Sequence, residues 1–307
     1  MALQKEVWST DIQENLYANN AFMAKSTDHS EWVNYKTVHI PQAGSNMAVV
    51  KNRQILPAQI TERTDTELTY NLNEYTAEPI VIRNIDELQL SYSKRMSVLG
   101  QYTDVLGDTV ANNTLYAWAP SGASRITRTT GTATGNALAP SATGTRNALT
   151  LLDISKAKAK LDAENVPQEG RVMIIPADMY NADLLAIPNI IQYFQNGSAA
   201  VLPTGVVARL FGFDIMVRSS VLVYDNQATP VIKTIGDNGI PTTPATTDNL
   251  AIIYYHPKFV AKALGAIEVF YDEDKPEYYG SLFSALVMHG ASKMRTSQIG
   301  VGAIVQS

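Results

Sequence analysis

The sequence predicts an α+β protein, and three observations carry this prediction. A long amphipathic helical pattern occupies the first half of the chain, a helix–strand–helix unit begins at Leu149, and strand patterns dominate the C-terminal part. At roughly 150 residues per domain, the 307 residues suggest about two domains. Because the chain contains Cys 0, disulfides, thiol nucleophiles and Cys-ligated metals are excluded.

The composition indicates a protein whose surface is partly covered by neighbours. Charged residues make up 17% of the chain, against roughly 25% in average proteins, and interface cores are depleted in Lys, Glu and Asp. The net charge of -5 argues against a broad basic face for nucleic acid. No apolar run reaches the roughly 18 residues that span a bilayer, and the N-terminus lacks a signal peptide pattern. We therefore expect folding in the cytosol.

The first predicted element is a short helix over Ser9–Met23. Thr10 and Gln13 have the spacing of a capping box. The residues Ile12 and Leu16 mark one thin apolar side, which could extend to Met23. Such a thin stripe suggests an arm that docks on another surface. A frayed terminal helix is an equal alternative.

A strand and an extended hairpin are predicted next. Trp32–Ile40 alternates like a strand and is closed by Pro41 and Gly44. The stretch Lys51–Glu67 is polar, and its only clear aliphatic side chains belong to Ile55, Leu56 and Ile60. Since such a segment cannot bury itself, it predicts a hairpin that reaches out from the body and lies on another surface. An ordinary flexible loop is the alternative.

A long helix is predicted after a strand at Pro79–Ile82. Asn84 is the expected N-cap and Glu87 occupies the capping-box position. The pattern could continue to Trp118, which would make a helix of about 50 Å, although Gly100 and Gly107 can bend it. Its apolar stripe is Ile85, Leu88, Tyr92, Met96, Leu99, Tyr102, Leu106, Val110 and Leu115.

The segment Ser121–Ala148 is rich in Thr, Ser, Gly and Ala and has no acidic residue. This composition predicts a mobile loop or linker. Its only charges are Arg125, Arg128 and Arg146, which could contact DNA phosphates, but a plain surface loop is the simpler interpretation.

An α/β unit follows from Leu149. The stretches LTLLDISKAKAKLDAENVP, RVMIIP and ADMYNADLLA have helix, buried-strand and helix patterns in turn. The remaining predicted elements are strands at Gly205–Leu210, Phe213–Val217, Val221–Tyr224, Leu250–Tyr255, Ile267–Tyr271, Phe283–Met288 and Val301–Val305, a polar loop at Asp225–Asn249 and a helix at Pro257–Leu264.

No catalytic, cofactor-binding or metal-binding residue is assigned from the sequence. The chain lacks a nucleophile elbow, a phosphate-binding loop and a dinucleotide-binding glycine pattern. His29, His39, His256 and His289 have no partner at a metal-ligand spacing, so each is expected to be structural. One acidic cluster, Asp272, Glu273, Asp274 and Glu277, is expected to be a solvated hairpin tip rather than a cation site; Arg residues of a neighbouring subunit are an intermediate possibility.

The stretch LTLLDISKAKAKLDAENVPQEGRVMIIPADMYNADLL joins a helix, Val-Pro, Gly-Arg, a strand and a second helix opened by proline. Further cues are GVVARLFGFDIMVRSS, His256-Pro257 and the closing GASKMRTSQIGVGAIV. With the order of arm, hairpin, long helix, α/β unit and late strand pair, they cover most of residues 30 to 305. The chain thereby resembles the major capsid proteins of tailed double-stranded-DNA bacteriophages, which have the Hong Kong 97 fold.

The resemblance implies a shell subunit with an α+β Hong Kong 97-like fold, without enzymatic activity or cofactors. The implied parts are an N-terminal arm (1–34), a peripheral domain (35–148) with an extended loop (about 42–78), a spine helix (about 84–118) and a flexible loop (121–148), an axial domain (149–265) with a polar loop or insertion (225–249), and C-terminal strands (266–307) that return to the peripheral domain.

The implied partners are further copies of the chain, as hexamers and pentamers, with a separate scaffolding protein and a portal. Packaged double-stranded DNA would be enclosed without sequence-specific binding, and no membrane is involved. The implied location is the virion, after synthesis and assembly in the host cytoplasm. Two alternatives stay open: an encapsulin-type nanocompartment shell, which resembles the same fold, and an α/β enzyme or ligand-binding protein.

Overall fold

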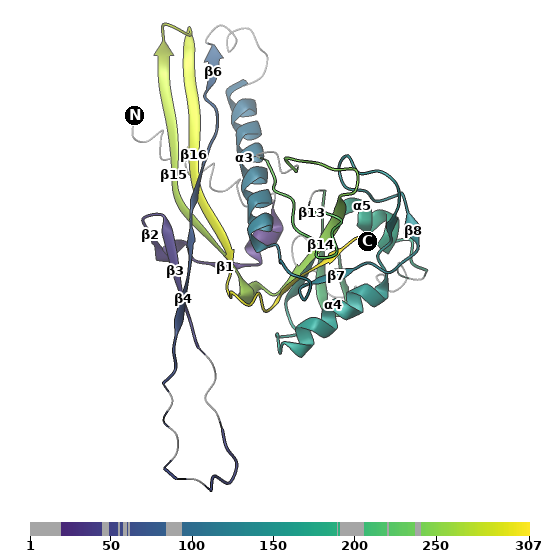
Figure 1. Ribbon diagram of the computed structural model, residues 1–307. Coiled ribbons are helices and arrows are strands. Elements are labelled where there is room, and N and C mark those ends of the chain that lie inside the picture. Colours follow the sequence, from purple (N-terminus) through teal and green to yellow (C-terminus); the bar gives the residue numbers. More distant parts are fainter. Residues whose placement is uncertain are drawn as a thin grey trace.

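The computed structural model describes residues 20–44, 49–54, 56–57, 60, 62–83, 94–188, 190, 206–219, 221–236 and 241–307. It consists of an elongated body, a globular body beside it and a thin hairpin that extends away from both (Figure 1). Most of the helix expected at Ser9–Met23 lies outside the described residues, as does the expected helix start at Asn84.

The elongated body is built on two long antiparallel strands, β15 (Val260–Lys275) and β16 (Gly280–Lys293). Strands β5 (Asn73–Thr76) and β6 (Ile80–Arg83) follow one another along the free side of β16, and β1 (Thr27–Asp28) pairs with the start of β15. We call this the long sheet. The predicted strands at Pro79–Ile82, Ile267–Tyr271 and Phe283–Met288 are confirmed as parts of it.

The predicted helix at Pro257–Leu264 is wrong. Only a 3-10 turn, η4 (Pro257–Phe259), forms there, and β15 begins at Val260. Val260–Leu264 pairs residue by residue with the end of β16. The pairing buries Val260, Ala261 and Ala263, so tertiary contacts override the local helical pattern.

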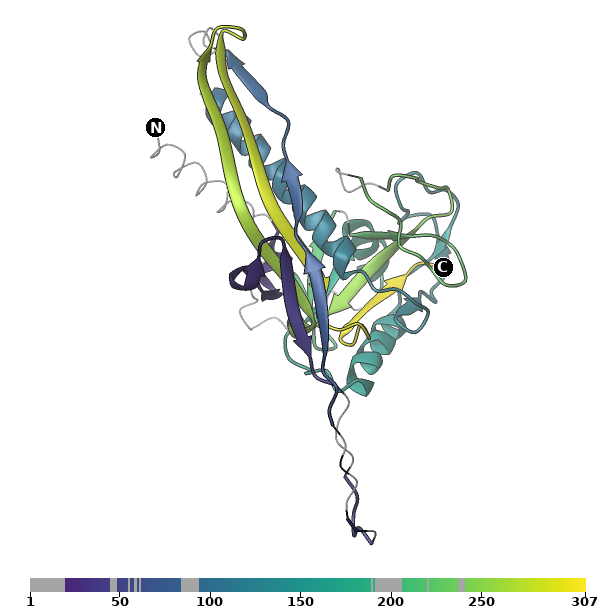
Figure 2. The same cartoon turned by 60° about the vertical axis from the view of Figure 1, so that its left-hand side comes forward.

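Helix α3 (Lys94–Trp118) lies along one face of the long sheet (Figure 2). Its Leu106 packs in a cluster with Val269, Phe283, Ala285 and Val287. The helix ends at Trp118, as the apolar stripe predicts. This indole is fully buried and donates a hydrogen bond from Nε1 to the carbonyl of Ala261 at 3.0 Å, so the helix end is fixed at the junction of the two bodies.

The globular body is built on a sheet that has seven strands within the described part of the chain, here called the globular sheet. Helix α4 (Leu151–Ala163), which Thr150 and Asp153 cap reciprocally, covers one face together with the short α5 (Ala177–Met179) and η3 (Tyr180–Leu184). The predicted α/β unit is confirmed. The strands are, in spatial order, β11 (Ala208–Leu210), β12 (Phe213–Arg218), β10 (Arg171–Pro176), β14 (Asn249–Tyr255), β17 (Val301–Val305) and β7 (Ile126–Arg128), with β13 (Leu222–Tyr224) beside β14.

The segment Ser121–Ala148, predicted to be a loop or linker, contains short strands among its turns. Part of the segment forms the edge strand β7, and another part forms the pair β8 (Ala133–Thr134) and β9 (Arg146–Asn147). Arg146 is buried and donates to the Oδ1 of Asn249 at 2.5 Å and to the carbonyls of Thr246 and Asp248 at 3.1 and 3.2 Å. One arginine therefore ties this segment to the polar loop at residues 225–249.

The implied return of residues 266–307 to the elongated body does not hold for β17. This strand lies between β14 and β7, inside the globular sheet. Val301, Ala303 and Val305 face one core cluster of that sheet and Ile304 faces the other, so the strand is buried on both sides.

A small sheet of β2 (Val33–Asn34), β3 (Thr37–Gln42) and β4 (Thr66–Asn71) forms the base of the thin hairpin. The single strand predicted over Trp32–Ile40 is broken at Tyr35, whose φ of 57° turns the chain back on itself. The predicted Pro41 break is absent, because Pro41 continues β3 opposite Glu67. Pairing ends at Gln42 and Thr66, beyond which the hairpin leaves the body.

Candidate assembly surfaces

The hairpin between β3 and β4 exposes apolar side chains that its own chain does not cover. Val49 and Ile60 are 96% and 97% exposed, and Leu56 is 78% exposed. The hairpin points away from both bodies in Figures 1 and 2. The prediction of a hairpin that reaches out from the body is confirmed, and these side chains can only be buried by another molecule.

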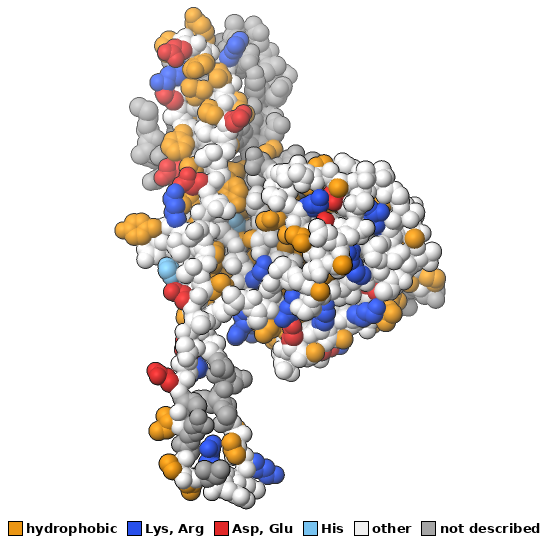
Figure 3. Space-filling model, in the orientation of Figure 1, with side chains coloured by type: hydrophobic (Ala, Val, Ile, Leu, Met, Phe, Trp, Pro, Cys, Tyr) orange, Lys and Arg blue, Asp and Glu red, His pale blue; other side chains and the backbone are white. Residues whose placement is uncertain are grey.

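The hairpin also carries positive charge near its end, at the exposed Lys51 and Arg53. Closer to its base, Arg63 pairs with Asp65 at 2.7 Å, and Asp65 accepts a hydrogen bond from the backbone N–H of Gly44 at 2.9 Å. The charges near the base are therefore neutralised locally. The end of the hairpin presents Lys and Arg beside exposed aliphatic side chains (Figure 3).

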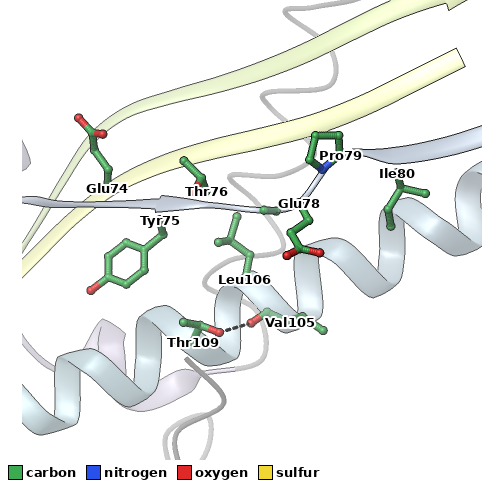
Figure 4. Close-up of a pocket in the computed structure, with 10 residues that line it drawn as sticks. Glu74, Tyr75, Thr76, Glu78, Pro79, Ile80, Val105, Leu106 and Thr109 are labelled. Carbon is green, nitrogen blue, oxygen red and sulfur yellow. Dashed lines mark hydrogen bonds between the residues drawn. The ribbon is translucent and has the colours of Figure 1, made fainter. Parts of the chain in front are cut away.

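A groove of about 560 Å³ lies between the β5–β6 edge of the long sheet and helix α3. Figure 4 shows Tyr75 and Ile80 reaching from the strands toward the helix, where Leu106 reaches back. Two carboxylates, those of Glu74 and Glu78, stand among the lining residues. The groove thus combines an apolar floor, acidic groups and a strand edge. Its full lining is Glu74, Tyr75, Thr76, Ala77, Glu78, Pro79, Ile80, Val105, Leu106 and Thr109.

The groove lies where the edge strand is interrupted. Residues 77–79 separate β5 from β6. Ala77 still bonds to β16, since its N–H donates to the carbonyl of Ala285 and its carbonyl accepts from the Ser284 hydroxyl. Burial raises the pKa of the Tyr75 phenol, which keeps it neutral in this floor. The sequence pattern predicted the strand but gave no signal for the groove, because its two walls come from separate elements.

The described end of the predicted arm is anchored in its own chain. Phe22 and Met23 are buried in the core of the globular body beside Trp118, and Thr27 and Asp28 pair with β15. The suggestion that the helix at Ser9–Met23 docks on another surface is therefore wrong at its end, and the implied arm (1–34) is attached to its own chain over residues 22–28. The sequence offered Met23 as a possible last member of the thin apolar side but gave no signal for Phe22, and it did not indicate that these residues join the chain's own core.

The four histidines have separate structural surroundings. His39 is exposed and pairs with Glu67, whereas the Nδ1 of His256 accepts the N–H of Lys258 and caps η4. His29 and His289 are buried near Asp28 and Lys262. Burial lowers the pKa of both imidazoles, that of His289 to about 4, so both are neutral at pH 7.

The acidic cluster lies at the tip of the β15–β16 ribbon, as predicted. Asp272 and Lys275 form an ion pair at 2.7 Å there, and Glu273 and Glu277 are exposed. Across the described ranges, no three His, Asp or Glu side chains come together as metal ligands. Among the helices that the structure describes, none has the length and apolarity needed to cross a bilayer.

Comparisons with known proteins identify what this fold is similar to. The family model described as "Phage capsid protein" matches residues 22–291. The capsid of cyanophage P-SCSP1u has a TM-score of 0.61 at 16% identity, with 91% of this chain and 85% of that chain covered. The capsid of Ralstonia phage GP4 has a TM-score of 0.63 at 10% identity, covering 91% and 86%.

A virus-like particle from Pyrococcus furiosus is also similar, with a TM-score of 0.53, 9% identity and 98% of both chains covered. No curated protein matches the sequence. The structural neighbours confirm the Hong Kong 97-like fold, and the family match favours a phage shell over the two alternatives left open by the sequence. The chain belongs to the phage capsid protein family, as the major shell subunit of a tailed phage.

Proposed function

We propose that copies of this chain form hexamers and pentamers of an icosahedral shell in which the hairpin of one copy lies in the groove of the next. The observation that carries the proposal is the hairpin itself, since Val49, Leu56 and Ile60 are almost fully exposed in the single chain. Fully burying one such aliphatic side chain contributes about 1.5–3 kcal/mol. Three of them at each contact, repeated around a ring, provide a substantial driving force.

The groove offers complementary chemistry to this hairpin. Its apolar floor of Tyr75, Ile80 and Leu106 can receive aliphatic side chains, and its Glu74 and Glu78 can face Lys51 and Arg53. Glu74 already pairs with Lys36, so Glu78 is the principal acidic partner. The unlike charges favour one register of the hairpin over others, which gives the contact its specificity.

The two bodies would have different places in such a shell. In this proposal the globular body, built on the globular sheet and helix α4, surrounds the axes of hexamers and pentamers. The elongated body, built on the long sheet and helix α3, lies at their periphery. A separate scaffolding protein and a portal would take part in assembly in the host cytoplasm. The finished shell would enclose double-stranded DNA without sequence-specific contacts and without catalysis, in keeping with the net charge of -5.

The test is assembly of purified variants, followed by light scattering and electron microscopy. We expect Leu56→Asp to leave the subunit folded but to abolish rings and shells, because it places a carboxylate in an apolar contact. The matched control Gln54→Asp adds the same charge at an exposed polar position of the same hairpin and should still assemble. Shells of Leu56→Asp in wild-type yield would refute the role of the hairpin.

A charge exchange tests the groove as the receptor. Glu78→Lys should weaken assembly, because it places a cation opposite Lys51 and Arg53. Combining it with Lys51→Glu and Arg53→Glu should restore assembly. If the combined variant assembles no better than Glu78→Lys alone, the hairpin lies elsewhere on the neighbouring copy.

A further inference from the structure

Residues 20–30, here called the strap, run from the core of the globular body to the base of the hairpin. Within these eleven residues the chain contacts helix α3, strand β12, strand β15 and strand β4. We propose that the strap couples the orientation of the hairpin to the globular sheet. The hairpin then moves with the globular body rather than independently of it.

The strap is anchored firmly at its globular end. Phe22 is 3% exposed, meets the Trp118 ring edge-on at 5.9 Å and lies 5.7 Å from the guanidinium of Arg218. Lys25 Nζ lies 3.3 Å from Oδ2 of the buried Asp214 on β12. An aromatic anchor and a partly buried ion pair thus fix this end to both α3 and the globular sheet.

The middle of the strap is bonded to β15. Thr27 and Asp28 pair in register with Ala261 and Lys262, and the N–H of His29 donates to the carbonyl of Lys262 at 2.8 Å. The Ser30 hydroxyl then accepts the N–H of Leu264 at 2.9 Å. Because residues 27–30 all pair with or bond to β15, a displacement at one end of the strap reaches the other end without being absorbed by a loop.

The other end of the strap meets the hairpin base through aromatic rings. His29 is 1% exposed, stacks on Trp32 with the ring centroids 4.9 Å apart and an angle of 24°, and places Nδ1 3.4 Å from the phenol oxygen of Tyr70. Tyr70 belongs to β4 and packs with Val38 of β3. The strap therefore contacts β4 directly through Tyr70, and β3 packs against Tyr70 in the same core cluster.

A second connection joins the hairpin base to the loop between β16 and β17. Gln42 Nε2 donates to the carbonyl of Met294 at 3.1 Å, and the Thr296 hydroxyl donates to Gln42 Oε1 at 3.2 Å. These two bonds belong to a single flexible side chain at the point where pairing of the hairpin ends. They limit the hairpin at one side, and the strap limits it at the other.

The coupling has a use in a shell, and this use rests on the proposed function. A hairpin that lies on a neighbouring copy would follow the angle between the two copies, which differs between flat and curved parts of a shell. Through the strap, the same angle would act on the globular sheet. Each subunit would thereby adjust its centre to the position of its neighbour.

The experiment measures distances in the isolated subunit. Because the chain contains Cys 0, Thr66→Cys at the hairpin base and Ser155→Cys on α4 can be spin-labelled without competing thiols. We expect one narrow distance peak, and we expect Lys25→Ala combined with His29→Ala to lose it in favour of a broad distribution. Gln42→Ala alone should broaden the peak less. Lys275→Ala breaks an ion pair at the far ribbon tip and should leave the peak unchanged.

Folding is checked by circular dichroism and thermal unfolding of every labelled variant. His29→Phe, made with Lys25 unchanged, keeps an aromatic ring stacked on Trp32 and should give the narrow peak of the wild type. A narrow, unshifted peak in the folded double variant would refute the coupling through the strap, whatever that variant does in assembly. If Leu56→Asp assembles like the wild type, the proposed function fails while the distance result is unaffected.

Discussion

Acidification from pH 7 to pH 4 should destabilise the subunit through His289. This imidazole belongs to β16 and is 1% exposed, and its Nε2 has no hydrogen-bond partner among the described residues. Burial, together with the charge of Lys262, lowers its pKa from 6.5 to about 4, while Asp28 opposes the shift. In the unfolded chain His289 therefore binds a proton near pH 6.5, whereas in the folded chain it does so only near pH 4.

The sign of the effect follows from this difference in proton binding. As the pH falls below 6.5 the unfolded state is favoured, so stability that is full above pH 6.5 is lost on the way to pH 4. The difference of about 2.5 pH units, at 1.36 kcal/mol each, gives a loss of about 3 kcal/mol. His29, whose pKa burial also lowers, should add to the loss in the same direction.

The assay is urea unfolding of the unassembled subunit at pH 7, 6, 5 and 4. The free energy of unfolding of the wild type should fall across this range, and His289→Gln should remove about 3 kcal/mol of that fall. Met288→Leu, at the neighbouring position of β16, is the control and should keep the wild-type slope. If His289→Gln and the wild type lose stability in parallel, the burial of a neutral imidazole is not the cause.

Three further predictions concern stability and share the same unfolding assay. Arg146→Ala should cost about 3 kcal/mol, because it leaves buried acceptors such as Asn249 Oδ1 without their donor, and limited proteolysis should then cleave the segment around it; resistance to protease would contradict this. Gly302→Ala should cost about 2 kcal/mol, since its Cβ would lie 2.3 Å from the Tyr254 ring. Gly135→Ala would meet one atom at 3.4 Å and should be nearly neutral, and equal effects of the two substitutions would refute the packing argument. Thr150→Ala should lower the free energy of unfolding by about 1 kcal/mol, because the N-cap of α4 is lost. Thr150→Ser keeps a capping hydroxyl and should retain most of the wild-type stability.

The elements that the sequence predicted correctly are those whose signal is local. The stripe of α3 and the cap at Thr150 lie within single stretches of chain, and so does the apolar run of β10. The exposed hairpin was also predictable, because a segment with few aliphatic side chains cannot form a core by itself. These features needed no knowledge of distant residues.

The features that the sequence missed depend on partners far along the chain. Arg146 finds its acceptors about 100 residues away, at Thr246–Asn249, and its polar surroundings are typical of a loop. The helical pattern after Pro257 was overridden by pairing with the end of β16. The groove needed two separate walls, and the strap needed a core that other elements supply. The hydrophobic periodicity of a single segment carries no information about contacts with segments far along the chain.

The place of β17 inside the globular sheet makes an early strand depend on one that is synthesised last. Strand β7 at Ile126–Arg128 pairs only with β17 at Val301–Val305 in the described sheet, so it must wait while the intervening chain leaves the ribosome. Contacts between such distant segments form slowly. A nascent subunit accordingly has an incomplete globular sheet after its hairpin has been synthesised. The globular body can be completed only when the last strand, β17, is available.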